Sequence, residues 1–267
     1  SELESIVKKG DESVVKAMEH VALWLYKIRY YSAAQYTNPS ECPVYLEVDF
    51  DSTEEEIRYR RARGLAARFL QSLHECSNEN EKAYRNFIDI IGPHGLGLIS
   101  SLEFKTVSAS NVDYSVRVGG QIQERSVEKM LIIPQFKIGN NTLSPNQLSE
   151  GTFRMMALVF FLVTEAHSLL LIEEPEVCVH HGLLSSLIEI IKMQAAEGQV
   201  VISTHSDFVL DHVEPESVFS VTRNDSGETV VKNLKASMSG KELAALREYL
   251  DTEGSLGEYW RDGGFER

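Results

Sequence analysis

The stretch LLLIEEPE, residues 169–176, decides the fold. Its four apolar residues predict a short buried strand of a parallel sheet, and the carboxylates of Glu173 and Glu174 follow directly. Ligands bind at the carboxyl ends of the strands in open α/β sheets, so this pair lies where chemistry is expected. Because adjacent side chains point to different sides of a strand, one glutamate can hold Mg²⁺ while the other orders an attacking water. A solvated acidic strand end is the alternative, but Pro175 fixes the turn and favours the functional interpretation.

A second strand is predicted from QVVISTHS, residues 199–206, which ends in a Thr-His-Ser sequence with His205 at its centre. Residues 180–198 have the length and apolar content of a crossover helix, so the two strands and this helix form a βαβ unit. The crossover would place His205 beside Glu174 at the same edge of the sheet. A lone histidine at a strand end is more often structural, but the neighbouring carboxylates favour a functional histidine here.

A third segment, LSEGTFRMMALVFFLV at residues 148–163, has a polar turn that opens a long apolar helix. The N-terminus of a helix presents free N–H groups and the positive end of the helix dipole, which suits a phosphate group. Ser149 adds a hydroxyl group, Glu150 follows it, and Gly151 lets a phosphate approach the backbone. Taken alone, such a turn is more often a simple helix cap than a ligand site.

The remaining sequence pattern divides the chain into two predicted parts. Residues 1–97 are expected to be mainly helical, with helices over 1–36 and 52–75 and a strand over 44–50. The run GPHGLG at residues 92–97 contains no lysine and does not fit a phosphate-binding loop, so a plain turn is predicted there.

The second part, residues 98–267, changes character along its length. Residues 98–138 show short alternating runs, which predict antiparallel strands. From residue 148 onward helix and strand patterns alternate, as in a parallel α/β unit. The sequence therefore predicts an α/β fold, in which an N-terminal helical region precedes a lobe with parallel strands.

Composition limits the classes of protein that fit. The net charge of −14 should repel nucleic acids, so contact with DNA or RNA would need a local patch or a partner. No apolar run reaches the roughly 18 residues of a membrane span, and three scattered cysteines fit a reduced, cytoplasmic protein. A local basic cluster is a candidate nucleic-acid or partner surface, with a solvated helix face as the alternative. Its members are Arg58, Arg60, Arg61, Arg63 and Arg68.

In their order and spacing, the three chemical segments resemble the C-terminal half of ABC-type ATPases, a group that includes the SMC, RecF and OLD-like proteins. LSEG resembles the signature motif, LLLIEEPE resembles Walker B with its catalytic glutamate, and the histidine of THS resembles the switch histidine. The runs at residues 29–43 and 254–264 resemble segments of AAA-family defence ATPases, such as those of Septu-type or retron-associated anti-phage systems.

Several positions depart from the family pattern. Most ABC proteins have aspartate where this chain has Glu173, and transporters have Gly-Gln where it has Thr152 and Phe153. Neither a Q-loop nor the P-loop pattern G-x-x-x-x-G-K-[ST] is found in the 267 residues. The P-loop half is therefore expected in a segment or chain other than these residues.

The resemblance implies an ATPase that dimerises head to tail around ATP and Mg²⁺. Glu173 would hold the Mg²⁺, Glu174 would position the attacking water, and His205 would contact the γ-phosphate. Residues 149–151 would contact the ATP of the partner subunit in a homodimer. Catalysis of this kind depends mainly on positioning and electrostatics.

The resemblance also implies a role for the dimer. Its opening and closing would control a separate effector, such as a nuclease, in anti-phage defence, with DNA or RNA involved and no membrane. One alternative is a nucleotide-responsive scaffold that holds a partner nuclease without hydrolysing ATP. Another is a DNA-repair or SMC-like ATPase, which would need long heptad repeats that are not visible in this sequence.

Overall fold

The computed structural model describes residues 12–32, 39–51, 56–59, 64–116, 122–177, 179–196, 198–252 and 254–265. The chain forms two compact units that divide between Val201 and Ile202. None of the helices in the described residues is long and apolar enough to span a membrane.

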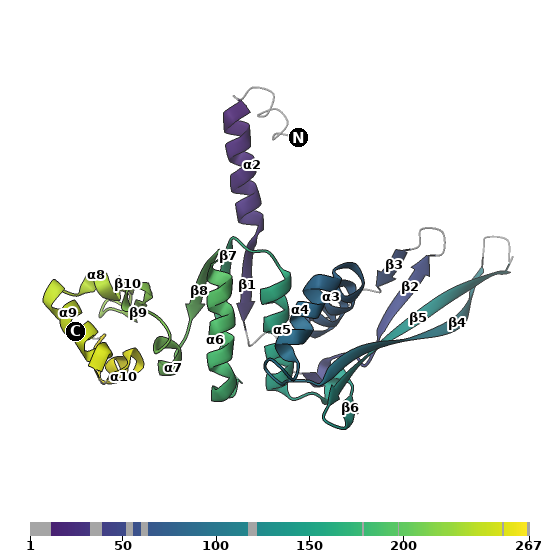
Figure 1. The fold of residues 1–267 in the computed structure, drawn as a ribbon. Coiled ribbons are helices and arrows are strands. Elements are labelled where there is room, and N and C mark those ends of the chain that lie inside the picture. The colour runs from purple at the N-terminus through teal and green to yellow at the C-terminus, as the bar shows by residue number, and fades with distance from the viewer. Residues whose placement is uncertain are drawn as a thin grey trace. The chain divides into compact units, whose positions relative to one another are not determined.

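A three-stranded sheet forms the centre of the first unit (Figure 1). Its order is β1 (Ile28–Ser32), β7 (Leu169–Glu173) and β8 (Gln199–Ser203). β1 runs parallel to β7, in a register that places Ser32 opposite Glu173. The predicted helix–strand–helix–strand order is confirmed, because α5 (Glu150–Thr164) precedes β7 and α6 (His181–Ala195) connects β7 to β8.

The core of the first unit is built around α5, which lies between the sheet and helices α3 (Leu65–Glu79) and α4 (Glu81–Ile91) (Figure 1). Phe69 of α3 packs edge-on against Phe160 of α5, with ring centroids 5.6 Å apart. Phe87 of α4 meets the same ring at 5.3 Å. Edge-to-face aromatic pairs stabilise a core beyond the area that they bury.

An antiparallel sheet also belongs to the first unit, as the alternating pattern predicted. Its strand order is β3-β2-β5-β4, and β6 pairs with β5. The fold class is thus confirmed as α/β, with a parallel sheet, antiparallel strands and helical regions. The antiparallel strands are β2 (Leu46–Asp51), β3 (Glu56–Tyr59), β4 (Ser101–Val116), β5 (Ile122–Ile138) and β6 (Asn141–Leu143).

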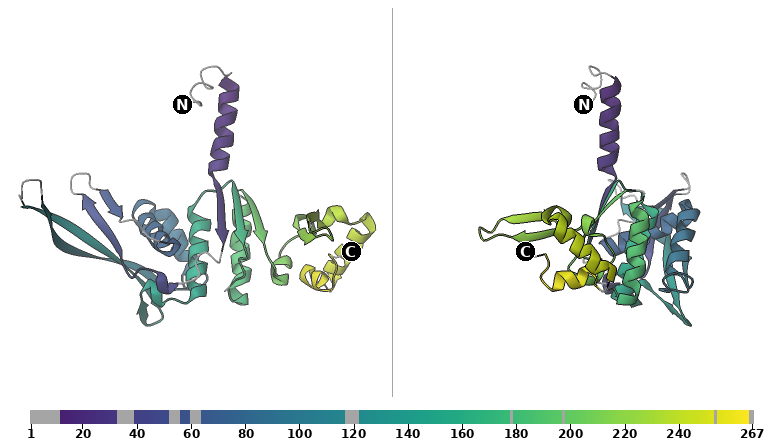
Figure 2. Two further views of the ribbon diagram at one scale, coloured as in Figure 1. Left: turned by 180° about the vertical axis from the view of Figure 1, so that it is seen from behind. Right: turned by 60° about the vertical axis from the view of Figure 1, so that its left-hand side comes forward.

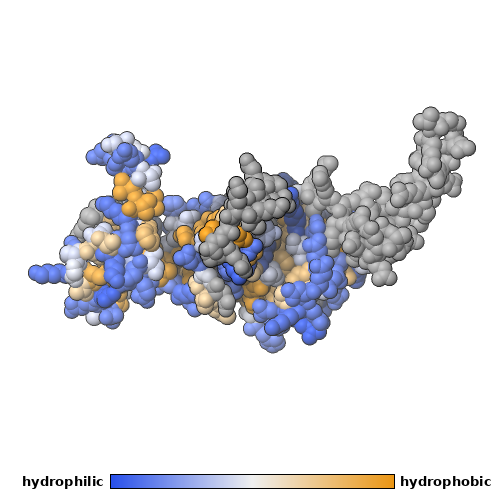
Figure 3. Space-filling model, turned by 90° about the horizontal axis from the view of Figure 1, so that it is seen from above, coloured by the Kyte–Doolittle hydropathy of each residue, from blue (hydrophilic) through white to orange (hydrophobic). Residues whose placement is uncertain are grey.

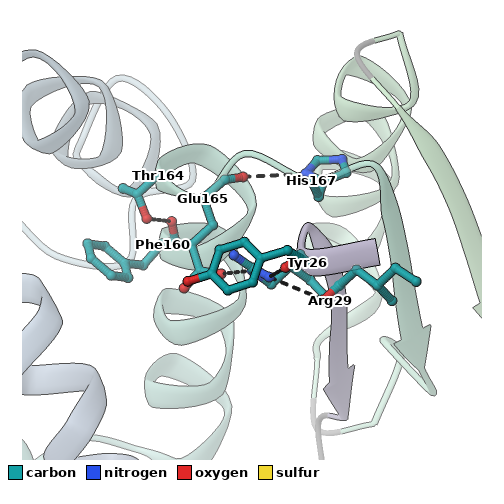
Figure 4. Close-up of polar contacts among 7 residues, drawn as sticks. Tyr26, Arg29, Phe160, Thr164, Glu165 and His167 are labelled. Atoms are coloured by element: carbon teal, nitrogen blue, oxygen red, sulfur yellow. Dashed lines mark hydrogen bonds and ion pairs between the residues drawn. The ribbon is translucent and has the colours of Figure 1, made fainter. Parts of the chain in front are cut away.

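Among the described residues, the prediction of one helix over residues 1–36 is wrong beyond Tyr26; residues 1–11 and 33–36 lie outside the described part of the chain. Helix α2 (Glu12–Tyr26) ends there, and Ile28–Ser32 forms strand β1 instead. The aromatic and β-branched residues of this run favour a pleated strand, and pairing with β7 provides its hydrogen bonds. Arg29 Nε fixes the start of β1 by donating to Glu165 Oε2 at 2.7 Å, next to the end of α5 (Figure 4).

The prediction of a helix over residues 52–75 is also wrong at residues 56–59, while residues 52–55 and 60–63 lie outside the described residues. β3 pairs with β2, and α3 begins only at Leu65, after Gly64 with a φ of 87°. At residues 56–59, pairing with a neighbouring strand overrides the local helical pattern. The predicted turn at residues 92–97 is present. Of the arginine cluster, Arg60, Arg61 and Arg63 lie outside the described residues.

The second unit has its own small core, in which Val218, Leu234, Leu246 and Leu256 are buried together. Strands β9 and β10 form an antiparallel hairpin beside short helices (Figure 2). The elements are α7 (Asp207–Leu210), β9 (Phe219–Arg223), β10 (Thr229–Asn233), α8 (Leu234–Ser237), α9 (Gly240–Thr252) and α10 (Leu256–Arg261). Single-turn 3₁₀ helices cover Pro39–Glu41, Pro145–Gln147 and Pro215–Ser217.

Candidate functional site

Glu173 is the last residue of β7, and hydroxyl groups of the neighbouring strand hold its carboxylate. Tyr30 Oη donates a hydrogen bond to Glu173 Oε2 at 2.5 Å. Hydrogen bonds from the hydroxyls of Tyr30 and Ser32 lower the pKa of Glu173 below its ordinary value. The carboxylate is therefore ionised at neutral pH and held at the carboxyl end of a parallel strand.

Glu174 follows with an unusual backbone. Its φ of 46° makes it the one non-glycine residue with a positive φ in the part of the chain that the structure describes. The left-handed region costs an L-residue about 1–2 kcal/mol, and strained residues of this kind cluster at functional sites. The turn closes where Val177 N donates to Glu174 O at 3.1 Å, next to the buried Pro175. The turn holds Glu174 just beyond the strand end, as the sequence predicted.

The turn before α5 is ordered by its own side chains. Thr152 N donates to Ser149 Oγ at 3.1 Å, and Ser149 Oγ donates to Thr152 Oγ1 at 2.8 Å. Ser149 is thus a helix N-cap, and Glu150 forms an ion pair with the buried Arg154 one turn later. Gly151 lies in the first turn of the helix, so the backbone N–H groups of a helix N-terminus are gathered at this point.

His205 belongs to the second unit, while Glu173 and Glu174 belong to the first. Its side chain is exposed and follows β8, where Ser206 N donates to Thr204 Oγ1 at 2.9 Å. The closeness of His205 to Glu174, expected from the βαβ crossover, stays a prediction.

The resemblance to ABC-type ATPases implies a bound Mg²⁺, and the side chains near the end of β7 can be compared with what that cation requires. Within the described ranges, no three His, Cys, Asp or Glu side chains are grouped to hold a metal ion. A closed protein cage, as in structural zinc sites, is therefore not formed by these residues. Mg²⁺ in nucleotide sites usually takes one or two carboxylates, with phosphate oxygens and water for the remainder. The adjacent carboxylates of Glu173 and Glu174 fit that second pattern.

Sequence reasoning missed Tyr30 and Ser32, because it placed both in a helix. The signal was present in the run IRYYS, whose β-branched and aromatic residues follow the last residue of helical periodicity, Leu25. Reading that run as a strand would have made it a candidate neighbour of β7.

Comparison with known proteins gives one sequence-level match. A family model described as an AAA domain, putative AbiEii toxin, Type IV TA system, matches residues 97–211. The matched segment contains the turn at 149–151, both glutamates of β7 and His205. Comparison with curated protein sequences found no match.

Solved structures of SMC ATPase heads are similar over part of this chain. One, from work on ATP-driven dimerisation and DNA-stimulated activation of SMC ATPases, is 14% identical, with 68% of this chain and 99% of that chain covered and a TM-score of 0.39. The Smc head bound to the C-terminal winged-helix domain of ScpA is 16% identical, with 58% and 43% covered and a TM-score of 0.39. The Smc head of Pyrococcus furiosus is 13% identical, with 67% and 40% covered and a TM-score of 0.40. The family match shows that residues 97–211 are similar to an AAA domain.

Proposed function

We propose that this chain supplies the signature, Walker B and switch-histidine part of an ABC-type ATPase, and that a P-loop segment outside these 267 residues completes the ATP site. The observation that carries the proposal is the pair Glu173 and Glu174 at the carboxyl end of the parallel strand β7. This pair lies within the segment that matches the AAA-domain model. The position of the two carboxylates and the family match together favour a site that acts on a phosphate group. The alternative is an acidic strand end that only contacts solvent.

Each side chain then has a role that its geometry supports. Glu173, held by the hydroxyls of the neighbouring strand, holds Mg²⁺, which neutralises phosphate charge when it is bound. Glu174 orders the attacking water, and its left-handed backbone is of the kind that persists only where the surrounding structure holds it in place. His205 contacts the γ-phosphate, in keeping with its place at the end of β8.

The N-terminus of α5 acts on a second nucleotide. Ser149, Glu150 and Gly151 contact ATP that is held by the P-loop of a partner subunit in a homodimer. The gathered N–H groups of the helix suit a phosphate. The Ser149 hydroxyl donates within its own turn, so Thr152, which accepts from it, keeps a hydroxyl proton for a ligand.

The output of the ATPase is control of a separate effector acting on DNA or RNA, such as a nuclease, in cytoplasmic anti-phage defence. The match to a model described as a putative AbiEii toxin of a Type IV toxin–antitoxin system supports such a context. The net charge of −14 favours contact with nucleic acid through the effector over direct contact.

Replacing Glu174 with glutamine tests the proposal in the protein that carries its P-loop. Glutamine keeps size and hydrogen bonding but cannot act as a carboxylate, so hydrolysis should fall by about 100-fold or more while ATP binding is retained. Glu189→Gln on the exposed face of α6 is the matched control and should leave the rate unchanged. Hydrolysis by Glu174→Gln at the wild-type rate would refute the assignment. Binding without hydrolysis in the wild type would favour the scaffold alternative.

Residues 1–267 alone offer a second test. ATP affinity in P-loop proteins comes mainly from the glycine-rich loop and its lysine, which these residues lack. Calorimetry should therefore detect no binding of Mg-ATP tighter than about millimolar, a level that already requires about 4 kcal/mol. Micromolar binding by the isolated chain would show that the nucleotide site is complete within it.

A further inference from the structure

The neighbouring strand β1 brings two hydroxyl groups to the carboxylate that is proposed to hold Mg²⁺. Tyr30 Oη lies 2.5 Å from Glu173 Oε2. Ser32 lies directly opposite Glu173 in the parallel register, and only 4% of its surface is exposed. Residues two apart on a strand lie on the same face, so both hydroxyls can reach one side chain.

β1 is itself fixed, so these hydroxyls have a defined position. Ser168, just before β7, donates from Oγ to Trp24 O at 2.5 Å, and its N–H donates to Lys27 O at 3.1 Å. Arg29 Nε adds the contact to Glu165 Oε2 at 2.7 Å. These contacts fix the main chain just before Tyr30, and the parallel pairing of Ile28–Ser32 with Leu169–Glu173 holds it on both sides of Tyr30.

We propose that Tyr30 and Ser32 are positioning residues, which fix the Glu173 carboxylate for the Mg²⁺ of the bound nucleotide. The inference rests on the proposed function, because it assigns a purpose to contacts at that site. An ionised carboxylate offers about four lone-pair sites, so it can accept both hydroxyls and still coordinate a cation. Groups that hydrogen-bond a metal ligand orient it and tune its affinity for the metal.

The length of the Glu173 side chain explains why such positioning is needed. Glutamate has one more rotatable bond than aspartate, and ordering it costs more conformational entropy. Glu173 is also exposed, so apolar packing does not restrict its rotamers. Two hydroxyl donors on an adjacent strand restrict them instead.

Tyr30→Phe in the protein that carries its P-loop is the main test, because it removes the hydroxyl and keeps the ring. Binding of Mn²⁺ in the presence of a non-hydrolysable ATP analogue, followed by electron paramagnetic resonance, gives a readout independent of turnover. Loss of an outer hydrogen-bond partner typically weakens metal binding by about 10-fold or more. Metal-free nucleotide binding should be unchanged. Tyr26→Phe, at a residue that is 78% exposed, is the matched control and should bind Mn²⁺ as the wild type does.

A double-mutant cycle tests whether Tyr30 acts through Glu173. The effect of Tyr30→Phe should disappear in a Glu173→Gln background, because the two side chains form one unit. Ser32→Ala should also weaken Mn²⁺ binding, and its thermal unfolding must match the wild type because Ser32 is buried. If Ser32→Ala does not fold, Tyr30→Phe and its cycle still decide the matter, because the Tyr30 ring is 55% exposed.

The results separate this inference from the proposed function. Wild-type protein that binds neither Mn²⁺ nor nucleotide would overturn both. Wild-type binding, together with unchanged or tighter Mn²⁺ binding by Tyr30→Phe, would overturn the positioning role alone. If Tyr30→Phe weakens Mn²⁺ binding equally in the wild-type and Glu173→Gln backgrounds, Tyr30 does not act through Glu173.

Discussion

Helices α2 and α5 are both fifteen residues long and rich in apolar side chains, but they have opposite environments. In α5 the residues from Phe153 to Phe160 are all buried. In α2 nearly every described side chain is exposed, including Val21 at 58% and Leu25 at 55%. The space-filling view shows hydrophobic patches interrupting a largely hydrophilic surface on the side toward which α2 extends (Figure 3).

The difference shows that the apolar content of a sequence predicts a helix but does not predict whether other residues bury it. α5 is stabilised by burial against aromatic side chains of two other helices. No described residue covers the stripe of Val14, Met18, Val21 and Leu25, so α2 depends on intrinsic helix propensity. A helix that is apolar on most sides normally lies inside a protein. Substitutions in the two helices should therefore have very different effects.

The largest effect is expected from Phe160→Ala in α5. The ring is 2% exposed and contacts both Phe69 and Phe87, so truncation leaves a cavity at the centre of the core. Such substitutions typically cost about 3–5 kcal/mol, which denaturant unfolding would measure. Met193→Ala, at a residue 71% exposed on α6, is the control and should change stability little. A small loss for Phe160→Ala would mean that the α5 core is not packed as described.

A smaller loss of stability is expected at acidic pH, from a histidine in α3, the helix that packs against α5. Burial lowers the pKa of His74 in α3, whose ring lies 4.9 Å from that of Phe104. Because the folded-state pKa is below the unfolded value of 6.5, the unfolded chain takes up the proton first. The contribution of His74 to stability is thus present above about pH 6.5 and is lost as pH falls through the folded pKa.

His74→Gln removes this titration and should flatten the fall in unfolding free energy between pH 7 and pH 5. His20→Gln on the exposed helix α2 is the matched control, because it makes the same substitution outside the core. The reverse result, with His20 controlling the slope, would place the acid-sensitive core at α2.

Leu25→Ala in α2 should cost about 0.5 kcal/mol or less in residues 1–267, as surface substitutions usually do. The leucine is half exposed, and alanine has the higher helix propensity. Denaturant unfolding of residues 1–267 alone would measure this change beside Phe160→Ala. A cost as large as that of Phe160→Ala would show that α2 packs against part of the chain and would remove the contrast between the helices.

The same contrast explains what the sequence could and could not predict. α5, β7 and α6 follow from local apolar patterns, so their existence and order were predictable. β1 was not, because its strand conformation depends on pairing with β7, about 140 residues further along. The start of α3 was missed for the same reason, since β3 forms only beside β2.

The candidate site divides in a similar way. Glu173 and Glu174 were predicted at a strand end because an apolar run followed by carboxylates is a local signal. The hydroxyls of Tyr30 and Ser32 come from a strand whose position depends on the tertiary fold. The left-handed backbone at Glu174 was equally unpredictable, because residue type alone argues against it.

The smallest quantity to measure is the coupling energy of an ion pair between residues that follow the two helices. Arg29 follows α2 and Glu165 follows α5, and their ion pair spans 2.7 Å with side chains 35% and 38% exposed (Figure 4). Solvent screens a pair with this exposure, so Arg29→Ala should cost about 1 kcal/mol or less, and less still at high salt. The guanidinium also donates to Tyr26 O at 2.7 Å, so part of any loss should persist in salt.

A double-mutant cycle of Arg29→Ala with Glu165→Gln isolates the ion pair from that backbone contact. The same cycle on Arg85 and Glu81, an exposed ion pair of α4, is the control. The coupling energy between Arg29 and Glu165 should be a few tenths of a kcal/mol, close to that of the control pair. A coupling above about 2 kcal/mol would mean that the junction is shielded from water, as charged pairs are in a core. The end of α2 would then share the environment of α5, and the difference between the two helices would begin only further toward the N-terminus.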